Sequence, residues 1–169
     1  MSGDDTPGGS LRFHTVEAGA GRLIVGRLLA GTDLIEGLEA ACDHHDVRFA
    51  AVAFAYGSLS SAGFKTLQVP ADSDRPVLTL ERVDRRLEFL GGQGLICRDD
   101  DDGRATHLHG CVSDETGQVL GGHFERGLNP VYNNMDFTLT ELLYVDLVRR
   151  WDEETATVEM VVAQRARTA

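Results

Sequence analysis

The chain has few cysteines, no long apolar run and almost no lysine, and each scarcity excludes a class of protein. Its three cysteines, Cys42, Cys97 and Cys111, form no CxxC pair and are odd in number. This pattern argues against a disulfide framework and favours a reducing compartment. No apolar run approaches the roughly 20 residues of a membrane span, and the acidic start MSGDDTPGGS lacks the apolar stretch of a signal peptide. We therefore expect a cytoplasmic protein with no membrane association.

Positive charge is also scarce, which bears on nucleic-acid binding. The formal net charge is −11, Lys65 is the only lysine, and aspartates occupy all four positions of 99–102. Such a surface repels phosphate backbones, so the composition disfavours DNA binding. An acidic, lysine-poor chain also suggests a high-salt or high-GC source. At molar salt a Debye length of about 3 Å would weaken that repulsion. We interpret the aspartate run as a solvated loop, because no EF-hand spacing follows it.

The 169 residues correspond to about one domain. We expect a flexible acidic tail at 1–10 and a single domain over 11–165. A helix is predicted from an N-cap at Thr32 or Asp33 to about His45. Turns are expected at 19–21 and 70–76, and strands, from their alternating apolar residues, at 11–15, 22–30, 49–60, 62–69, 77–83, 87–96, 107–113, 118–124, 137–149 and 155–162. This order predicts an α/β fold of the α+β type, with a mainly antiparallel β-sheet and one or two helices.

Three histidines are distinguished by their spacing. His107 and His109 are two residues apart on an expected strand, so both imidazoles point to the same face. A three-residue loop at 115–117, with Gly117 in the left-handed position, places His123 directly opposite His109 on the next strand. A two-residue loop would instead shift the register by one residue and turn His123 to the other face. The convergence of the three rings is therefore a prediction that depends on this turn.

Three imidazoles on one face are typical of a metal site. Three histidine ligands leave a fourth position open, as in catalytic zinc centres, and imidazole also binds iron, nickel and copper. We therefore predict zinc, or another divalent first-row metal, on His107, His109 and His123. The alternative is that each histidine is an ordinary surface or core residue with a hydrogen-bond partner. Cys111 faces the same side, where we interpret it as a small core residue rather than a fourth ligand.

The segment HLHGCVSDETGQVLGGH at 107–123 resembles the signature of the PPC domain, whose name stands for "plants and prokaryotes conserved". Weaker matches to this family are LEFLGGQGLI at 87–96, Arg27 and Gly31 ahead of the expected helix, and the Gly-Ser-Leu turn at 57–59. The resemblance extends over about residues 11–165. The chain differs from the plant members because it lacks an AT-hook, a Gly-Arg-Pro core among basic residues.

The resemblance implies a compact α/β trimer that carries a metal, usually zinc, on the residues matching His107, His109 and His123. It also implies a fold similar to that of acetolactate decarboxylase, which holds zinc on a comparable histidine set. Many prokaryotic members of the family are labelled DNA-binding by similarity. Likeness of fold strengthens the expectation of a site without establishing a reaction.

Two further residues are candidates for catalysis. Glu88 lies on an apolar strand, where its carboxylate is a candidate general acid or base, or a group that orients a metal ligand. A solvated residue is the alternative interpretation of Glu88. Arg27 is a candidate clamp for a substrate carboxylate, and the alternative is a salt bridge at a trimer interface.

Three functions are consistent with these observations. The favoured one is a metal-binding PPC homotrimer that binds or converts a small carboxylate-bearing molecule. The second is a DNA-associated regulator, as the family label suggests. The third is a structural trimer whose metal only stiffens the histidine hairpin. The sequence leaves open whether the protein is an enzyme.

Overall fold

The computed structural model describes residues 12–71 and 77–166, which form ten strands and one helix. In chain order the elements are β1 (Gly19–Leu29), α1 (Leu34–His44), β2 (Ala50–Leu59), β3 (Ala62–Gln68), β4 (Val77–Val83), β5 (Leu87–Arg98), β6 (Arg104–Ser113), β7 (Val119–Phe124), β8 (Val131–Leu143), β9 (Val145–Asp152) and β10 (Thr157–Gln164). The expected acidic tail at 1–10 and most of the expected turn at 70–76 lie outside the described residues.

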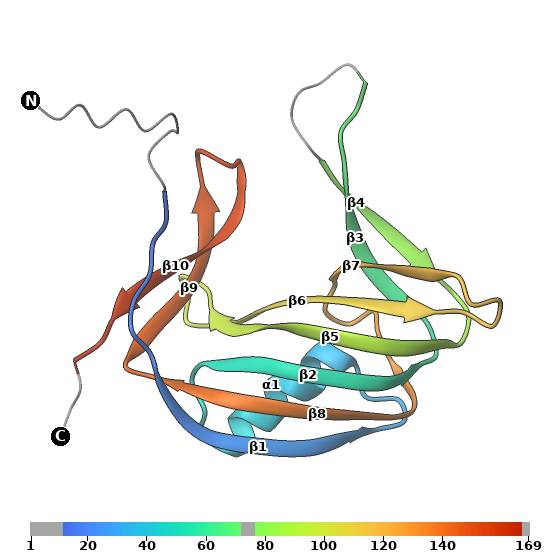
Figure 1. The fold of residues 1–169 in the computed structure, drawn as a ribbon, viewed down its shortest axis with the longest axis horizontal. Helices are drawn as coiled ribbons and strands as arrows, with labels where there is room; N and C mark the ends of the chain where they lie inside the picture. Colours follow the sequence, from blue (N-terminus) through green and yellow to red (C-terminus); the bar gives the residue numbers. More distant parts are fainter. Residues whose placement is uncertain (1–11, 72–76, 167–169) are drawn as a thin grey trace, which may run out of the picture.

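One curved sheet dominates the described part of the chain (Figure 1). Eight strands follow a single path, in the order β1-β8-β2-β5-β6-β7-β3-β4, and all neighbours along it are antiparallel. β9 and β10 form a hairpin that meets this path through one parallel pair, Arg98 with Val148. The prediction of a mainly antiparallel sheet is confirmed, with a single helix in the described residues.

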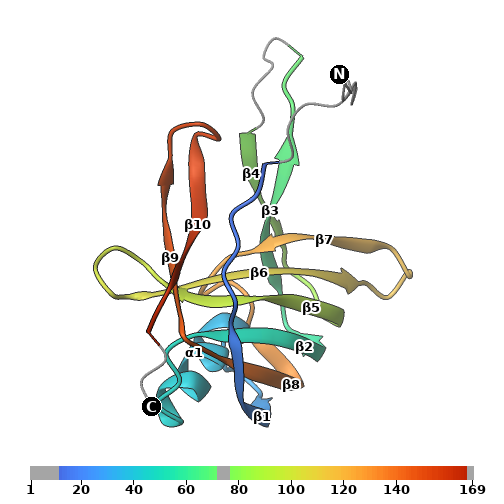
Figure 2. The same cartoon turned by 60° about the vertical axis from the view of Figure 1, so that its left-hand side comes forward.

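The strand order combines local and distant pairings. β3–β4, β5–β6, β6–β7 and β9–β10 are hairpins of consecutive strands. β8, in contrast, lies between β1 and β2, far from both in the sequence. Figures 1 and 2 show that the β3–β4 and β9–β10 hairpins rise from the same side of the sheet. The order of strands in the sequence therefore accounts for only part of their order in the sheet.

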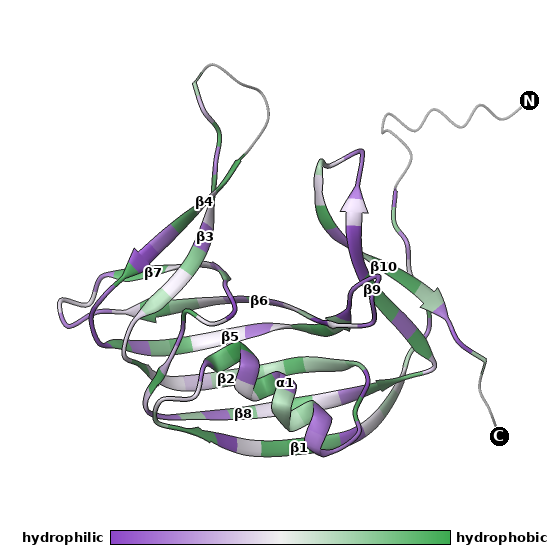
Figure 3. Ribbon diagram, turned by 180° about the vertical axis from the view of Figure 1, so that it is seen from behind, coloured by the Kyte–Doolittle hydropathy of each residue, from purple (hydrophilic) through white to green (hydrophobic). Residues whose placement is uncertain are grey.

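Helix α1 covers one face of the sheet (Figure 3). Asp33 caps it as predicted, because its Oδ1 accepts hydrogen bonds from the backbone N–H groups of Ile35 and Glu36. Leu34 and Leu38 are fully buried against the sheet, and each such burial contributes about 1.5–3 kcal/mol of hydrophobic stabilisation. The helix is too short and too polar to cross a membrane, and the described residues contain no other.

The opposite side of β1 and β2 retains exposed apolar side chains, which we call the open face: Leu23, Val25, Phe54 and Tyr56. Val25 and Phe54 both pair with Thr138 of β8, so the two side chains share one face of the sheet. Val25 is 73% exposed and Phe54 is 45% exposed. An apolar group of this kind is typical of a surface that meets another molecule.

Three expectations about secondary structure are wrong. Residues 12–18 carry no strand, although one was expected over 11–15, and 19–21 begin β1 instead of forming a turn. The expected strand 137–149 is interrupted at Tyr144, whose φ of 64° lies in the left-handed region. A single left-handed residue redirects the chain without disturbing the apolar pattern, so the alternation of residues alone does not reveal the break.

Candidate metal centre

The turn that joins β6 to β7 has the predicted three-residue form. The N–H of Asp114 donates to the carbonyl oxygen of Gln118 at 3.1 Å, and Gly117 has a φ of 81°. The carboxylate oxygen Oδ1 of Asp114 accepts from the backbone N–H of Thr116 at 2.9 Å and from that of Gln118 at 3.1 Å. These bonds select the three-residue loop over the two-residue alternative.

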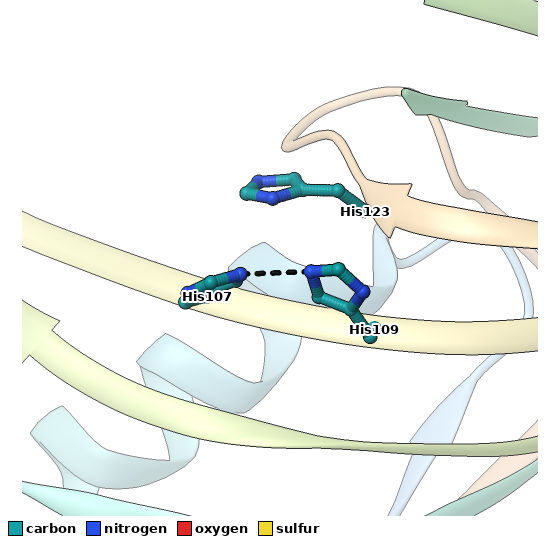
Figure 4. A group of neighbouring side chains, drawn as sticks. All are labelled: His107, His109 and His123. Atoms are coloured by element: carbon teal, nitrogen blue, oxygen red, sulfur yellow. Dashed lines mark hydrogen bonds between the residues drawn. The ribbon is translucent and has the colours of Figure 1, made fainter. Parts of the chain in front are cut away.

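This turn sets the register that brings the histidines together. β6 and β7 pair His109 directly with His123. His107 points to the same face as His109, because Leu108 between them is fully buried on the core side. The ligand atoms of the three residues lie within 4.8 Å of one another, and the Nε2 atoms of His107 and His109 are 2.8 Å apart (Figure 4). The structure therefore brings together all three histidines of the predicted set.

The surroundings of the cluster keep two of its rings neutral. Burial, with the charge of Arg149 and the neighbouring rings, lowers the pKa of His107 to about 4. Burial, with His109 and Arg149, likewise lowers the pKa of His123 to about 4. A neutral imidazole keeps a lone pair on one ring nitrogen, which is the form that coordinates a cation. Three converging imidazoles therefore fit the divalent metal that the resemblance implies.

A cavity of about 310 Å³ opens beside the cluster. Its lining comes from β5 and β6 on one side and from the β9–β10 hairpin on the other, and includes His107, His109, Leu95, Arg149, Glu159 and Met160. The volume lies at the lower end of the roughly 300–1,000 Å³ typical of small-molecule pockets. The site therefore has room for a small ligand in contact with two of the histidines.

Arg149 of β9 brings a guanidinium into contact with the cluster. Its Nη1 donates to Nδ1 of His107, and its Nη2 donates to the carbonyl oxygen of Val158 at 2.8 Å. The sequence analysis missed Arg149, which lies 42 residues from His107 in the chain. No local spacing connects the two residues, so only the fold reveals their contact.

Glu125 places a carboxylate beside the cluster. Its Oε1 lies 3.6 Å from Nε2 of His123 and 2.9 Å from Nζ of Lys65, which pairs with His123 across β3 and β7. A carboxylate in this position can orient the imidazole of a metal ligand. The sequence analysis missed Glu125, although it follows His123 by two residues, the same spacing that relates His107 to His109.

The two residues predicted for catalysis lie away from the histidines. Glu88 pairs with Ser113, four residues along β6 from His109, which corresponds to roughly 13 Å at the usual rise of a strand. Arg27 lies on β1, four strands from β6 in the sheet, or roughly 19 Å at the usual strand spacing. Its Nε binds Oδ1 of Asp136 at 3.2 Å within the same chain.

Fold and cluster together define a small β-sheet domain that presents three histidines from one hairpin. The family model of the Plants and Prokaryotes Conserved (PCC) domain matches residues 15–143, more than half of the chain. The chain therefore belongs to the PCC family, abbreviated PPC above. The match ends before β9 begins at Val145, so Arg149 and the rest of the β9–β10 hairpin lie outside it.

The chain is also similar to three known proteins. The chain is 32% identical over 160 residues to the bifunctional protein GlmU of Synechococcus sp. (strain JA-3-3Ab), covering 95% of this chain and 22% of that protein. It thus spans about a fifth of the length of this curated relative. The metal-containing protein AF0104 from Archaeoglobus fulgidus has a similar fold, with a TM-score of 0.75, 20% identity, and coverage of 88% of this chain and 99% of that one. A Ralstonia eutropha JMP134 protein with a provisional DNA-binding label has a TM-score of 0.67, 21% identity and coverage of 81% and 89%.

Proposed function

We propose that this PCC-domain protein holds a divalent first-row cation, with zinc the expected ion, on His107, His109 and His123. The observation that carries the proposal is the convergence of the three ligand atoms within 4.8 Å. A cation held there supplies Lewis-acid chemistry toward an oxygen of a small molecule. The Archaeoglobus fulgidus protein, described as metal-containing, supports the proposal by its similar fold.

The proposal includes a small carboxylate-bearing ligand at the position that three histidines leave open. The cavity supports this, because it opens onto His107 and His109 and has a volume of about 310 Å³. Glu88 lies four residues along the strand from the histidines, and Arg27 lies four strands away, so neither side chain reaches a ligand bound there. We therefore assign neither of them to this site, and we propose ligand binding without a reaction.

The test is elemental analysis of protein purified without added chelator. We expect about one zinc ion per chain for the wild type and almost none for the double variant His107→Ala/His109→Ala. The matched control is His44→Ala/His45→Ala, which removes two exposed histidines at the end of α1 and should retain the metal. Full metal content in the His107→Ala/His109→Ala protein would overturn the proposal.

DNA binding is the second candidate, supported by the provisional label on the Ralstonia eutropha structure. The charges of this chain weigh against it, because most of its described arginines already bind carboxylates. The ion pairs are Arg12–Glu154, Arg22–Glu141, Arg27–Asp136, Arg48–Asp102, Arg85–Asp114, Arg104–Asp43, Arg126–Glu39, Arg150–Asp100 and Arg165–Asp146. A mobility-shift assay decides, since retention of duplex DNA that weakens with salt would favour this candidate.

The third candidate is a structural homotrimer whose metal stiffens the hairpin. The open face supports association of identical chains, since Val25 and Phe54 expose apolar surface on one side of the sheet. Light scattering of the eluting protein should give three chains for the wild type and fewer for Phe54→Glu, which places a charge in the apolar contact. A structural role for the metal predicts a lower melting temperature after chelation. An unchanged melting temperature would exclude this third candidate.

We also propose that residues 11–165 act as one domain in the cytoplasm. The core supports the single domain, because β9 contributes Val145 and Leu147 to a buried cluster with Cys97 of β5 and with Phe49, which directly precedes β2. Limited proteolysis should leave this span intact, and cleavage between β8 and β9 would contradict it. Fractionation of the native cells would test the location.

A further inference from the structure

Arg149 differs from the other arginine of its hairpin in what it contacts. Arg150, the next residue, binds Oδ1 of Asp100 at 2.8 Å. Among the described residues, Arg149 has no carboxylate within ion-pair distance; it binds a ring nitrogen of His107 and a carbonyl oxygen instead. A half-buried guanidinium at the wall of a cavity, without an anionic partner, is a receptor for an anion from solution.

The hydrogen bond between Arg149 and His107 depends on the protonation of the ring. A guanidinium only donates, so Nδ1 of His107 must be the acceptor, and Nε2 then carries the proton that is directed at Nε2 of His109. If Nε2 of His107 binds a cation, that nitrogen loses its proton and the neutral ring carries a proton on Nδ1 instead. Nδ1–H cannot accept from Arg149, so loading of the site releases the guanidinium into the cavity.

A bound cation would make the cavity more favourable for an anion. Glu159 also lines the cavity, but it pairs with Arg150 across the hairpin, whereas Arg149 pairs with Met160. A divalent cation on neutral imidazoles would add two positive charges on the histidine side of the cavity. Leu95 and Met160 supply apolar lining, which suits the carbon skeleton of a short organic acid.

We propose that Arg149 is the carboxylate receptor of the metal site, and that the β9–β10 hairpin which carries it determines ligand specificity. This inference rests on the proposed metal function. It assigns the carboxylate-binding role, predicted for Arg27, to a residue outside the family match. The ligand class is a short monocarboxylate with a neighbouring hydroxyl or carbonyl oxygen for the cation.

The test is calorimetric titration of zinc-loaded protein with lactate and with lactamide, in which a neutral amide replaces the charged carboxylate. Wild type should bind lactate more tightly than lactamide. Arg149→Gln should weaken lactate binding by about 10- to 100-fold, the usual effect of losing a charge-assisted hydrogen bond. Arg149→Lys, which keeps the charge and loses the planar fork, should lie between the two. The matched control Arg150→Gln removes the same charge one residue away and should bind like wild type.

Zinc content of every variant, measured in parallel, separates the two proposals. A wild type that takes up no zinc would overturn the proposed function, and this inference with it. Zinc-loaded wild type that binds lactate no more tightly than lactamide would overturn the inference alone. The inference would also be overturned if zinc-loaded, folded Arg149→Gln bound lactate as tightly as the wild type does. It would equally be overturned if Arg150→Gln lost as much lactate affinity as Arg149→Gln.

Discussion

The two hairpins that border the candidate metal centre are held by the molecule in different ways. β6–β7 lies within the main sheet, between β5 and β3, and buries Leu108 and Val112 completely. β9–β10 joins the sheet only near its base, where Val145 and Leu147 are buried, and exposes Trp151 further along. The hairpin that presents the histidines thus pairs with a neighbouring strand along each edge, whereas the hairpin that carries Arg149 is anchored at one end.

Both hairpins use the same device at their turns. Asp114 accepts from the backbone N–H and the hydroxyl of Thr116, and Asp152 accepts from the same two groups of Thr155. The two hairpins are therefore held with different firmness because of their packing and not because of their turns. Metal ligands need a rigid frame to hold their geometry, while a pocket wall can change without disturbing the fold.

The largest expected effect comes from the core face of β6. Leu108→Ala removes a fully buried side chain and should lower the free energy of unfolding by about 2–5 kcal/mol. Val161→Ala on β10 removes a side chain that is 44% exposed and should cost about 0.5 kcal/mol or less. Urea unfolding midpoints measure both, and equal losses would contradict the contrast between the hairpins.

A smaller effect is expected at the β6–β7 turn. Gly117→Ala forces a Cβ into the left-handed region, which costs about 1–2 kcal/mol, and should also weaken metal binding by disturbing the position of His123. Gly91→Ala is the matched control, because a Cβ there meets only open space at an ordinary φ. Denaturation and zinc titration of both variants check this. Equal zinc affinity in the two would show that the turn does not set the register of the site.

Acid should destabilise the metal-free protein through two histidines of the cluster, His107 and His123. In the metal-free protein the pKa values of folded His107 and His123 are about 4, below the ordinary 6.5. The unfolded chain therefore binds these protons first, so the free energy of unfolding falls as the pH drops from about 6.5 toward 4. Urea midpoints at pH 7 and pH 5 measure the change, and His107→Gln/His123→Gln should reduce it. If the double variant kept the full pH dependence, the loss of stability would not come from the lowered pKa values of His107 and His123.

The subtlest expected difference is in local opening. From His109 to Ser113, β6 pairs with β5 on one side and with β7 on the other, whereas β10 pairs only with β9 among the described residues. We expect amide hydrogens of β6 to exchange about tenfold more slowly, or slower still, than those of β10. Exchange followed by mass spectrometry of peptides from the two strands tests this. Similar protection would show that the β9–β10 hairpin is as firmly held as the sheet.

Local features of this fold were predictable, and distant ones were not. The helix cap at Asp33 and the hairpin bearing the histidines depend on residues a few positions apart, and both predictions are confirmed. The insertion of β8 between β1 and β2 and the break at Tyr144 were not predicted. Apolar alternation specifies which face of a strand is buried, but it says little about which strand lies next to it.

The candidate site shows the same division. By itself, the sequence determined that His107 and His109 share a face and predicted that His123 joins them if the turn at Gly117 has three residues, because strand alternation and turn type are short-range properties of the backbone. The structure has that turn. Only the tertiary structure decided that Arg149 reaches the cluster while Glu88 and Arg27 do not. The physical reason is that contacts between segments far apart in the chain depend on the order of strands in the sheet. That order is set by collective packing of the core, which no local pattern of residues records.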